Sequence, residues 1–239
     1  MTKKHHRLGF IIPAINVIAE DDYITLAADD VGVHFARADV DTNREVAEQF
    51  QQMIDAAPTL AASIAKAGIT VVGFACTSAS FFQGEGSDQV IAQNMTAAAG
   101  VPTYTTATAA VNALRTVGAK RIAIATPYLS WVYEAERAFF QHAGFEVLAI
   151  NGLERRGGTD INSITGDEIR ALVEDIDRPD ADAIFVSCTD LPVLDLIDEL
   201  ERTYRKPVLS SNQATFWAAA KADGVSPISG YGTLLKDHL

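Results

Sequence analysis

The 239-residue sequence predicts an α/β fold of two half-domains related by a pseudo-twofold axis, each a mostly parallel sheet flanked by helices. Three observations support this prediction. Short β-like runs alternate with helical patterns, the runs are rich in Val and Ile with little polar alternation, and three motifs occur twice along the chain. Strand and helix alternation is typical of parallel sheets covered by helices, and apolar strands indicate burial on both faces.

The expected strands are, in chain order, RLGFII, VGVHFAR, ITVVGFAC, VPTYTT, RIAIAT, FEVLAI, ADAIFVS and PVLSS. Apolar residues recur at helical spacing over 43–66, 107–117, 131–143, 165–175 and 194–204. Thr165, with Glu168 three residues later, is typical of a capped helix start.

The repeat divides the chain into two lobes. RLGFIIPAINVIAE resembles RIAIATPYLSWVYE, with Pro13 and Pro127 in register, and GVPTYTTATAAVNALRTVG resembles KPVLSSNQATFWAAAKADG. The cysteine motifs ITVVGFACTSAS and ADAIFVSCTDLP form the third pair, at a similar separation. Three motifs at similar separations are hard to obtain by chance. We therefore expect a first lobe of residues 1–110 plus 213–239 and a second lobe of residues 111–212.

Cys76 and Cys188 are the only cysteines, and each closes an apolar run at a corresponding point of its lobe. Ligands of open α/β sheets bind at the carboxyl ends of strands, so both thiols are expected to face one small substrate. Residues that commonly start helices follow each cysteine. The free N–H groups and the positive dipole end of a helix start stabilise a nearby thiolate. The alternative is that both cysteines pack as small apolar residues.

Composition and charge limit the function classes. A formal charge of -12 argues against a nucleic-acid partner, which needs a clustered basic surface. Neither a membrane span nor a signal peptide is evident, so we expect a cytoplasmic protein without a membrane partner. No cysteine or histidine spacing predicts a metal site, and no strand-flanked glycine fingerprint predicts a nucleotide. A homo-oligomer, either a dimer or a tetramer, is the default for an enzyme of this size.

Two further polar residues are expected at strand ends. Asn16, three residues after Pro13, is predicted to point its amide into the site. Tyr128, directly after Pro127, is predicted to place its phenol hydroxyl nearby. The alternatives are a local turn or helix cap for Asn16 and a half-buried aromatic for Tyr128. The stretch 157–162 reads either as a mobile loop that closes over the site or as an ordinary surface loop.

These motifs resemble the aspartate/glutamate racemase superfamily, in its branch of maleate cis-trans isomerases and arylmalonate decarboxylases. The resemblance runs through PAIN, ACTSAS, TPY, the loop with Asn162, SCTD, SSNQATFWAA and GYGTLL, and so covers nearly the whole chain. It implies a racemase-like, two-lobed enzyme that needs no cofactor and uses a cysteine from each lobe. Its partner would be a small carboxylate substrate.

Within the branch, the motif details indicate an isomerase. Decarboxylases are expected to carry glycine where this chain has Cys76 and to lack the asparagine matched by Asn16. By the resemblance, Cys76 would add to maleate to give a succinyl-cysteine adduct, Cys188 would protonate the adjacent carbon, and rotation and elimination would release fumarate. The residues implied to hold the two carboxylates are Asn16, Thr77, Ser78, Tyr128, Asn162, Thr189 and Asp190.

Several features leave alternatives open. Maleate isomerases show Pro-Ser-Ser-Asn where this chain has Pro-Ala-Ile-Asn, and the C-terminal motifs resemble the decarboxylases. Asp190 would repel a dianion unless its side chain points away. The alternatives are a two-thiol racemase or epimerase of an amino acid or hydantoin, an arylmalonate-type decarboxylase, and a non-enzymatic small-acid binding or thiol-redox protein.

Overall fold

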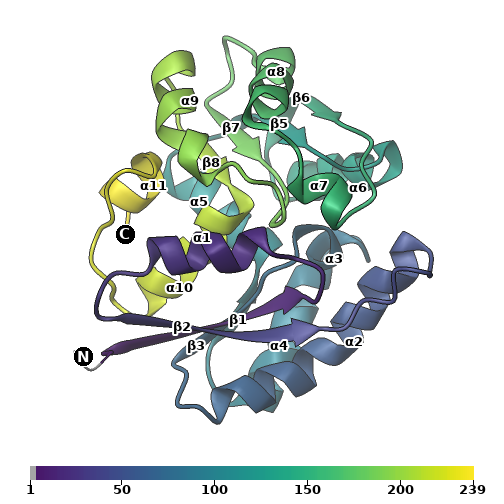
Figure 1. The fold of residues 1–239 in the computed structure, drawn as a ribbon. Coiled ribbons are helices and arrows are strands. Elements are labelled where there is room, and N and C mark those ends of the chain that lie inside the picture. The colour runs from purple at the N-terminus through teal and green to yellow at the C-terminus, as the bar shows by residue number, and fades with distance from the viewer. Residues whose placement is uncertain (1–3) are drawn as a thin grey trace.

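The computed structural model describes residues 4–239 and confirms the predicted fold class. Two four-stranded parallel sheets lie at opposite ends of the molecule, with helices on and between them (Figure 1). The first sheet has the order β2-β1-β3-β4 and the second the order β6-β5-β7-β8. Each strand of the second sheet thus occupies the place of its counterpart in the first, as the repeat predicted.

The first sheet and its neighbouring helices comprise β1 (His6–Pro13), α1 (Ile18–Leu26), β2 (Val31–Ala38), α2 (Val46–Ala65), β3 (Val71–Phe74), α3 (Thr77–Phe81), α4 (Ser87–Ala99), β4 (Thr103–Thr105) and α5 (Thr106–Thr116). The second comprises β5 (Arg121–Thr126), α6 (Ser130–His142), β6 (Glu146–Gly152), α7 (Thr159–Asn162), α8 (Gly166–Ile176), β7 (Ala183–Val186), η1 (Leu194–Leu196), α9 (Ile197–Tyr204), β8 (Val208–Ser210), α10 (Ser211–Ala222) and α11 (Gly232–Asp237).

All eight expected strands are present, and helix caps end two of them before the end of the expected run. β4 stops at Thr105, whose side chain accepts a hydrogen bond from Thr108 N and caps α5. β8 stops at Ser210, which forms a capping box with Gln213 at the start of α10. The expected capping box of Thr165 and Glu168 is also present, at the start of α8. A capped helix therefore follows the last strand of each sheet directly.

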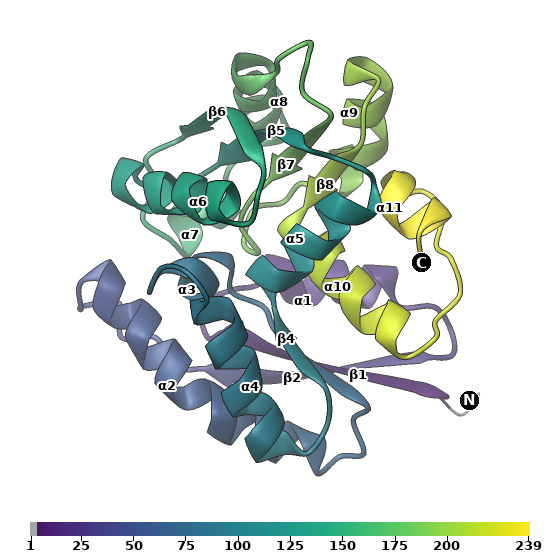
Figure 2. The ribbon, with the colours of Figure 1, turned by 180° about the vertical axis from the view of Figure 1, so that it is seen from behind.

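Helices α5 and α10 lie side by side between the two sheets (Figure 2). They are joined there by a buried hydrogen bond between the hydroxyls of Thr106 and Thr215, 2.8 Å apart. The main core cluster includes apolar residues of both sheets, such as Phe10 of β1 and Phe185 of β7. Shared packing places the carboxyl ends of the strands of the two sheets near one another. The exact lobe boundaries stay a prediction.

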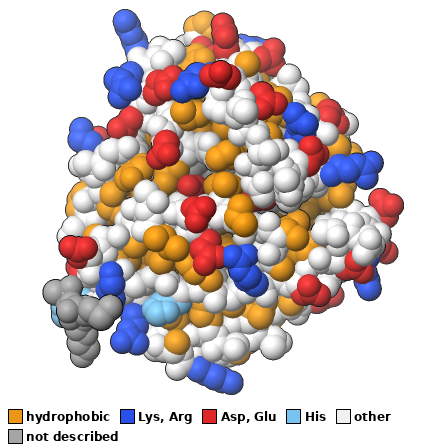
Figure 3. All heavy atoms as spheres, viewed as in Figure 1, with side chains coloured by type: hydrophobic (Ala, Val, Ile, Leu, Met, Phe, Trp, Pro, Cys, Tyr) orange, Lys and Arg blue, Asp and Glu red, His pale blue; other side chains and the backbone are white. Residues whose placement is uncertain are grey.

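The surface carries mixed charges. On the face shown in Figure 3, acidic, basic and apolar side chains are interspersed. Within residues 4–239, no helix is both long and apolar enough to cross a membrane.

A tyrosine of the first sheet anchors α10. The Tyr104 hydroxyl donates to the carbonyl of Thr215 at 2.9 Å, and Gly73 makes room for the ring. A Cβ at Gly73 would lie 2.8 Å from that hydroxyl, inside contact distance.

We expect Tyr104→Phe to lower the free energy of unfolding by about 1 kcal/mol, because the Thr215 carbonyl loses its donor in a buried environment. Urea denaturation followed by circular dichroism measures this change. Tyr204→Phe, at the end of α9, is the control, since its ring is only partly buried and should leave the midpoint unchanged. Equal midpoints for all three proteins would show that the bond contributes nothing.

Candidate active site

One cleft at the carboxyl ends of the strands contains both thiols. Cys76 follows β3 and Cys188 follows β7, the corresponding strands of the two sheets, and both side chains line the same cleft. Each cysteine is 6% exposed, so the sulfurs are almost fully shielded but open to this one space. This arrangement answers the main structural question raised by the sequence: the two thiols share a cavity.

Cys76 lies directly before the first turn of α3. The Ala79 N–H and the Ser78 hydroxyl act on its sulfur, and both lower the pKa of the thiol. Burial outweighs them and raises the pKa to about 11. Cys76 is therefore a protonated thiol at neutral pH whose surroundings already contain groups that stabilise the thiolate.

Cys188 has a strained backbone. Its φ is 109°, a region that residues with a side chain rarely adopt. Its N–H donates to the Ser211 hydroxyl at 3.0 Å, and the Asp190 N–H donates to its sulfur at 3.4 Å. Burial and then the nearby Asp190 carboxylate raise the pKa of the Cys188 thiol further than that of Cys76. The two thiols thus differ in acidity, with Cys188 the weaker acid.

The Asp190 side chain turns toward α1. Its Oδ1 accepts hydrogen bonds from the N–H groups of Val17, at 3.2 Å, and Ile18, at 3.5 Å. Burial raises the pKa of Asp190 to about 6, against these bonds and one from the Asn162 side chain, which lower it. The carboxylate of the second lobe therefore caps a helix of the first lobe.

The Asn16 side chain caps the start of α1 and also forms a hydrogen bond to Thr189 of the second lobe. Its Oδ1 accepts from Ala19 N at 2.9 Å, so the helix-cap alternative is correct, and its Nδ2 donates to the Thr189 hydroxyl at 3.1 Å. The Thr189 hydroxyl in turn donates to the carbonyl of Ala75, at 3.1 Å. Asn16 and Thr189 both line the cleft, so one amide serves the helix start, the cysteine turn and the cavity wall.

Tyr128 is buried and lines the cleft beside both cysteines. Burial raises the pKa of its phenol well above the usual range, so the hydroxyl stays protonated, and it is a hydrogen-bond partner of Cys188. The carbonyl of Tyr128 lies against Gly152, where a Cβ would come within 2.5 Å of it. The glycine at the end of β6 therefore allows the tyrosine its position.

Of the other predicted substrate-binding residues, Thr77 and Ser78 line the cleft and Asn162 lies outside its lining. Thr77 and Ser78 line the cleft, but the Thr77 hydroxyl already donates to the Ser211 hydroxyl at 2.9 Å. Asn162, on α7, is half-buried and contacts Asp190 rather than appearing in the cleft wall. The substrate-binding roles of these residues stay predictions.

Ser211 and Asn212, at the start of α10, belong to the site but were not predicted from the sequence. Ser211 links Thr77 to the N–H of Cys188, and the Asn212 amide donates to the Thr189 carbonyl at 3.0 Å. Both residues lie within the repeated motif KPVLSSNQATFWAAAKADG, where Ser211 is the last residue of the predicted strand PVLSS and Asn212 the next residue. The repeat could therefore have indicated this position, because predicted site residues also lie at or after the strands of the other two repeated motifs.

Much of the cleft wall is apolar. Its apolar residues are Pro13, Ile15, Val40, Val46, Phe50, Met53, Leu129, Val132 and Ile161. Gln49, Arg155 and Arg156 line the cleft as well as the polar residues described above. The cleft therefore combines a largely apolar surface with a smaller number of hydrogen-bonding groups, as small-molecule sites commonly do.

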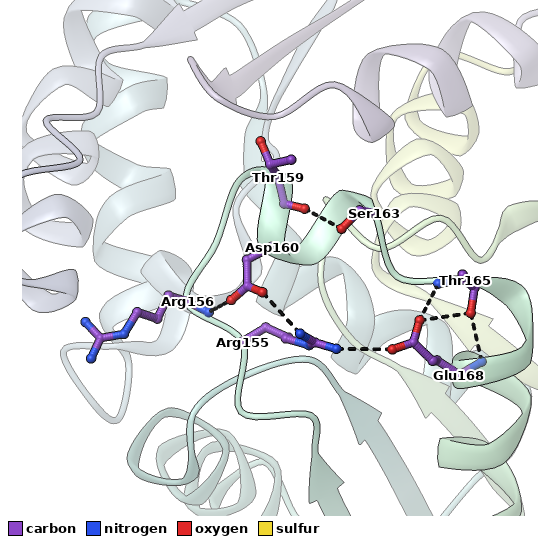
Figure 4. A network of polar contacts seen from close by, with 7 residues as sticks. All are labelled: Arg155, Arg156, Thr159, Asp160, Ser163, Thr165 and Glu168. Carbon is purple, nitrogen blue, oxygen red and sulfur yellow. Dashed lines mark hydrogen bonds and ion pairs between the residues drawn. The ribbon is translucent and has the colours of Figure 1, made fainter.

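The segment before α7 forms one side of the cleft and is fixed by ion pairs (Figure 4). Arg155 reaches both Asp160, at 3.3 Å, and Glu168, at 3.1 Å, while Asp160 also accepts from Arg156 N at 2.9 Å. The Arg156 side chain points away from this network (Figure 4). Within the described part of the chain, no group of three or more His, Cys, Asp or Glu side chains could hold a metal ion.

The fold and the site define a class: a two-lobed α/β protein with one thiol from each lobe in a shared cleft. The arylmalonate decarboxylase family model matches residues 8–235, and the chain belongs to this family. The predicted branch is thereby confirmed.

Relatives named for either of the two activities of the branch resemble the chain over almost its full length. Arylmalonate decarboxylase from Bordetella bronchiseptica is 31% identical, over 96% of each chain. Maleate isomerase from Nocardia farcinica is 26% identical, over 96% of this chain and 95% of the relative. A cysteine variant of the maleate isomerase Iso from Pseudomonas putida S16, solved with maleate, has a TM-score of 0.92 and 27% identity, over 98% of each chain.

Asn212, which donates to the Thr189 carbonyl beside Cys188, also contacts a buried carboxyl, and this contact predicts that stability depends on pH. Asn212 also donates to Asp22 at 2.7 Å, and burial raises the pKa of this carboxyl from 3.8 to about 7. The folded state thus favours the protonated acid. Its stabilising contribution is complete below pH 3.8 and is lost as the pH rises through about 7.

We expect Asp22→Asn to gain stability relative to the unsubstituted protein as the pH rises from 4 to 8, by on the order of 2 kcal/mol. Urea denaturation at several pH values measures this difference. Asp21→Asn, on the exposed side of the same helix, is the control. A difference for Asp22→Asn that is constant across the pH range would contradict the assignment.

Proposed function

We propose that the protein is a cofactor-independent isomerase that converts the cis form of a small unsaturated dicarboxylate, such as maleate, into the trans form. The observation that carries the proposal is the shared cleft, in which two shielded thiols lie beside Asn16, Ser78 and Tyr128 as hydrogen-bond donors. Two thiols of different acidity suit a reaction that needs one nucleophile and one proton donor.

The different acidities of the thiols support one assignment of roles. Cys76 has the lower pKa, so it loses its proton to solvent more readily and its sulfur adds to an alkene carbon. Cys188 stays protonated and gives its proton to the neighbouring carbon, which leaves a saturated adduct with a carbon–carbon single bond. After rotation about that bond, Cys188 takes a proton back, the carbon–sulfur bond breaks and the trans alkene leaves.

Backbone groups support the binding of a carboxylate. The first N–H groups of α3, those of Thr77 and Ser78, have no acceptor within residues 4–239. They can donate to a substrate carboxylate next to Cys76, as helix starts do for other anions. The Asp190 carboxylate also lines the cleft and raises the pKa of both thiols, but its Oδ1 accepts hydrogen bonds from the N–H groups of Val17 and Ile18, which offset part of its charge.

We predict that the protein converts maleate to fumarate under reducing conditions, and that Cys76→Ala and Cys188→Ala each lower kcat by at least about 100-fold. Proton NMR follows both acids directly. The rate should rise with pH toward the Cys76 pKa of about 11, because the thiolate fraction increases. Ser63→Ala, on the surface helix α2, controls for general effects of substitution. The absence of turnover with reduced thiols would reject the maleate form of the proposal.

The apolar wall supports a second candidate, decarboxylation of an arylmalonate. The relative from Bordetella bronchiseptica carries that name, and residues such as Phe50, Met53 and Val132 offer an apolar surface to a bulky substituent. Loss of carbon dioxide would leave its electron pair on the substrate carbon, and the Cys188 thiol would protonate that carbon. This reaction has no step for Cys76.

Phenylmalonate distinguishes the two candidates. If the protein is a decarboxylase, it should release carbon dioxide from phenylmalonate, Cys76→Ala should keep this activity and Cys188→Ala should lose it. Carbon dioxide release and phenylacetate formation are measured together. The absence of carbon dioxide release by the unsubstituted protein would exclude the decarboxylase assignment, and equal loss in both variants would exclude a mechanism that uses Cys188 alone.

A further inference from the structure

A buried carboxyl lies behind the Cys188 turn and has no part in the chemistry proposed above. Glu136, on α6, is 0% exposed. Its Oε1 accepts a hydrogen bond from the Ser187 hydroxyl at 2.5 Å, and its Oε2 has no partner within residues 4–239. Ser187 is the residue directly before Cys188.

The surroundings favour the neutral form of this acid. An ionised carboxylate with one bare oxygen in the core would lose its hydration without compensation. Burial accordingly raises the pKa of Glu136 to about 8, although the bond from Ser187 lowers it. At neutral pH the carboxyl is therefore largely protonated.

Other charges near Glu136 are few. On α6 itself, Arg137 pairs with Glu134 at the surface. The helix packs against β6, whose Glu146 is exposed, and against α3, which has no ionisable side chain. The facing titratable group is the Tyr128 phenol, whose pKa Glu136 raises, and Tyr128 is also a hydrogen-bond partner of Cys188.

Ser187 joins the carboxyl to the strained cysteine. The Ser187 N–H donates to the Ala125 carbonyl at 2.8 Å, which ties the backbone to β5, while its hydroxyl is held by Glu136. The next residue has the φ of 109°. A strained conformation persists only where its neighbours are fixed, and Ser187 is fixed on both its backbone and its side chain.

We propose that Glu136 is a positioning residue for Cys188: in its neutral form it holds Ser187 and the strained turn, and once ionised it disfavours the Cys188 thiolate. Only the importance of Glu136 for catalysis rests on the proposed function, whereas its effect on the Cys188 thiol does not. Its test uses thiol reactivity and needs no turnover, so the two proposals can fail separately.

The test compares Glu136→Gln with the unsubstituted protein. The amide keeps an acceptor for Ser187 but cannot ionise. Iodoacetamide alkylates the thiolate, with a carbon–sulfur bond formed and iodide released, and mass spectrometry of the peptides gives separate rates for Cys76 and Cys188 across pH 6.5–10. Glu134→Gln, an exposed carboxyl on the same helix, is the matched control.

At pH 7 we expect similar Cys188 rates in all three proteins. Above the Glu136 pKa of about 8, the Cys188 rate in Glu136→Gln should exceed that of the unsubstituted protein by about fivefold, because no carboxylate opposes the thiolate. The increase should be larger for Cys188 than for Cys76, and Glu134→Gln should match the unsubstituted protein.

Equal Cys188 rates in Glu136→Gln and the unsubstituted protein at every pH would overturn the proposal. Should Glu136→Gln not fold, as judged by circular dichroism, the unsubstituted protein decides the matter. Its Cys188 rate must then rise less steeply with pH through 8 than its Cys76 rate, and parallel profiles would reject the proposal.

Discussion

The chain passes through Cys188 in a backbone conformation that costs free energy, and contacts from several elements hold it there. Ser211 accepts the cysteine N–H, Asn212 donates to the Thr189 carbonyl, and the Thr189 hydroxyl reaches Ala75 of the first lobe. These bonds cross between parts of the chain that are distant in sequence. The position of one thiol therefore depends on the docking of both lobes, and the cleft exists only when they are packed together.

Burial dominates the electrostatics of the site. It raises the pKa values of both thiols and of the carboxyls Asp22, Glu136 and Asp190, so most of these groups are close to neutral in the folded protein. Asp190 is the most readily ionised of them, and helix α1 offers its N–H groups to that charge. Among the described residues that line the cleft, Asp190 is the only acidic one and Arg155 and Arg156 are basic, despite the net charge of -12.

Sequence patterns predicted the fold because the determining signals were local. Apolar runs identified all eight strands, and Thr165 with Glu168 identified the start of α8. The repeat placed Cys76 and Cys188 at corresponding strand ends, and parallel sheets gather such ends in one region. The sequence patterns placed the ends of β4 and β8 later than the structure does. The strands end at Thr105 and Ser210, because the side chains of these residues cap the helices that follow.

The rest of the site depends on contacts between distant residues. Nothing in the local sequence says that Asp190 caps α1, that Asn162 contacts Asp190 or that Ser211 joins Thr77 to Cys188. Glu136 lies in a helix whose sequence gives no sign that this one carboxyl is buried against Ser187. The apolar wall of the cleft likewise combines residues that are distant in sequence, such as Phe50 and Val132.

If the two thiols face one ligand, a short bifunctional reagent should reach both of them at once. Treating the reduced protein with 1,3-dichloroacetone at alkaline pH and mapping the peptides by mass spectrometry reports which sulfurs become joined. We expect a bridge between Cys76 and Cys188 within one chain, and protection of both thiols by a bound substrate. Separate single adducts on each cysteine, with no bridge formed, would contradict this expectation.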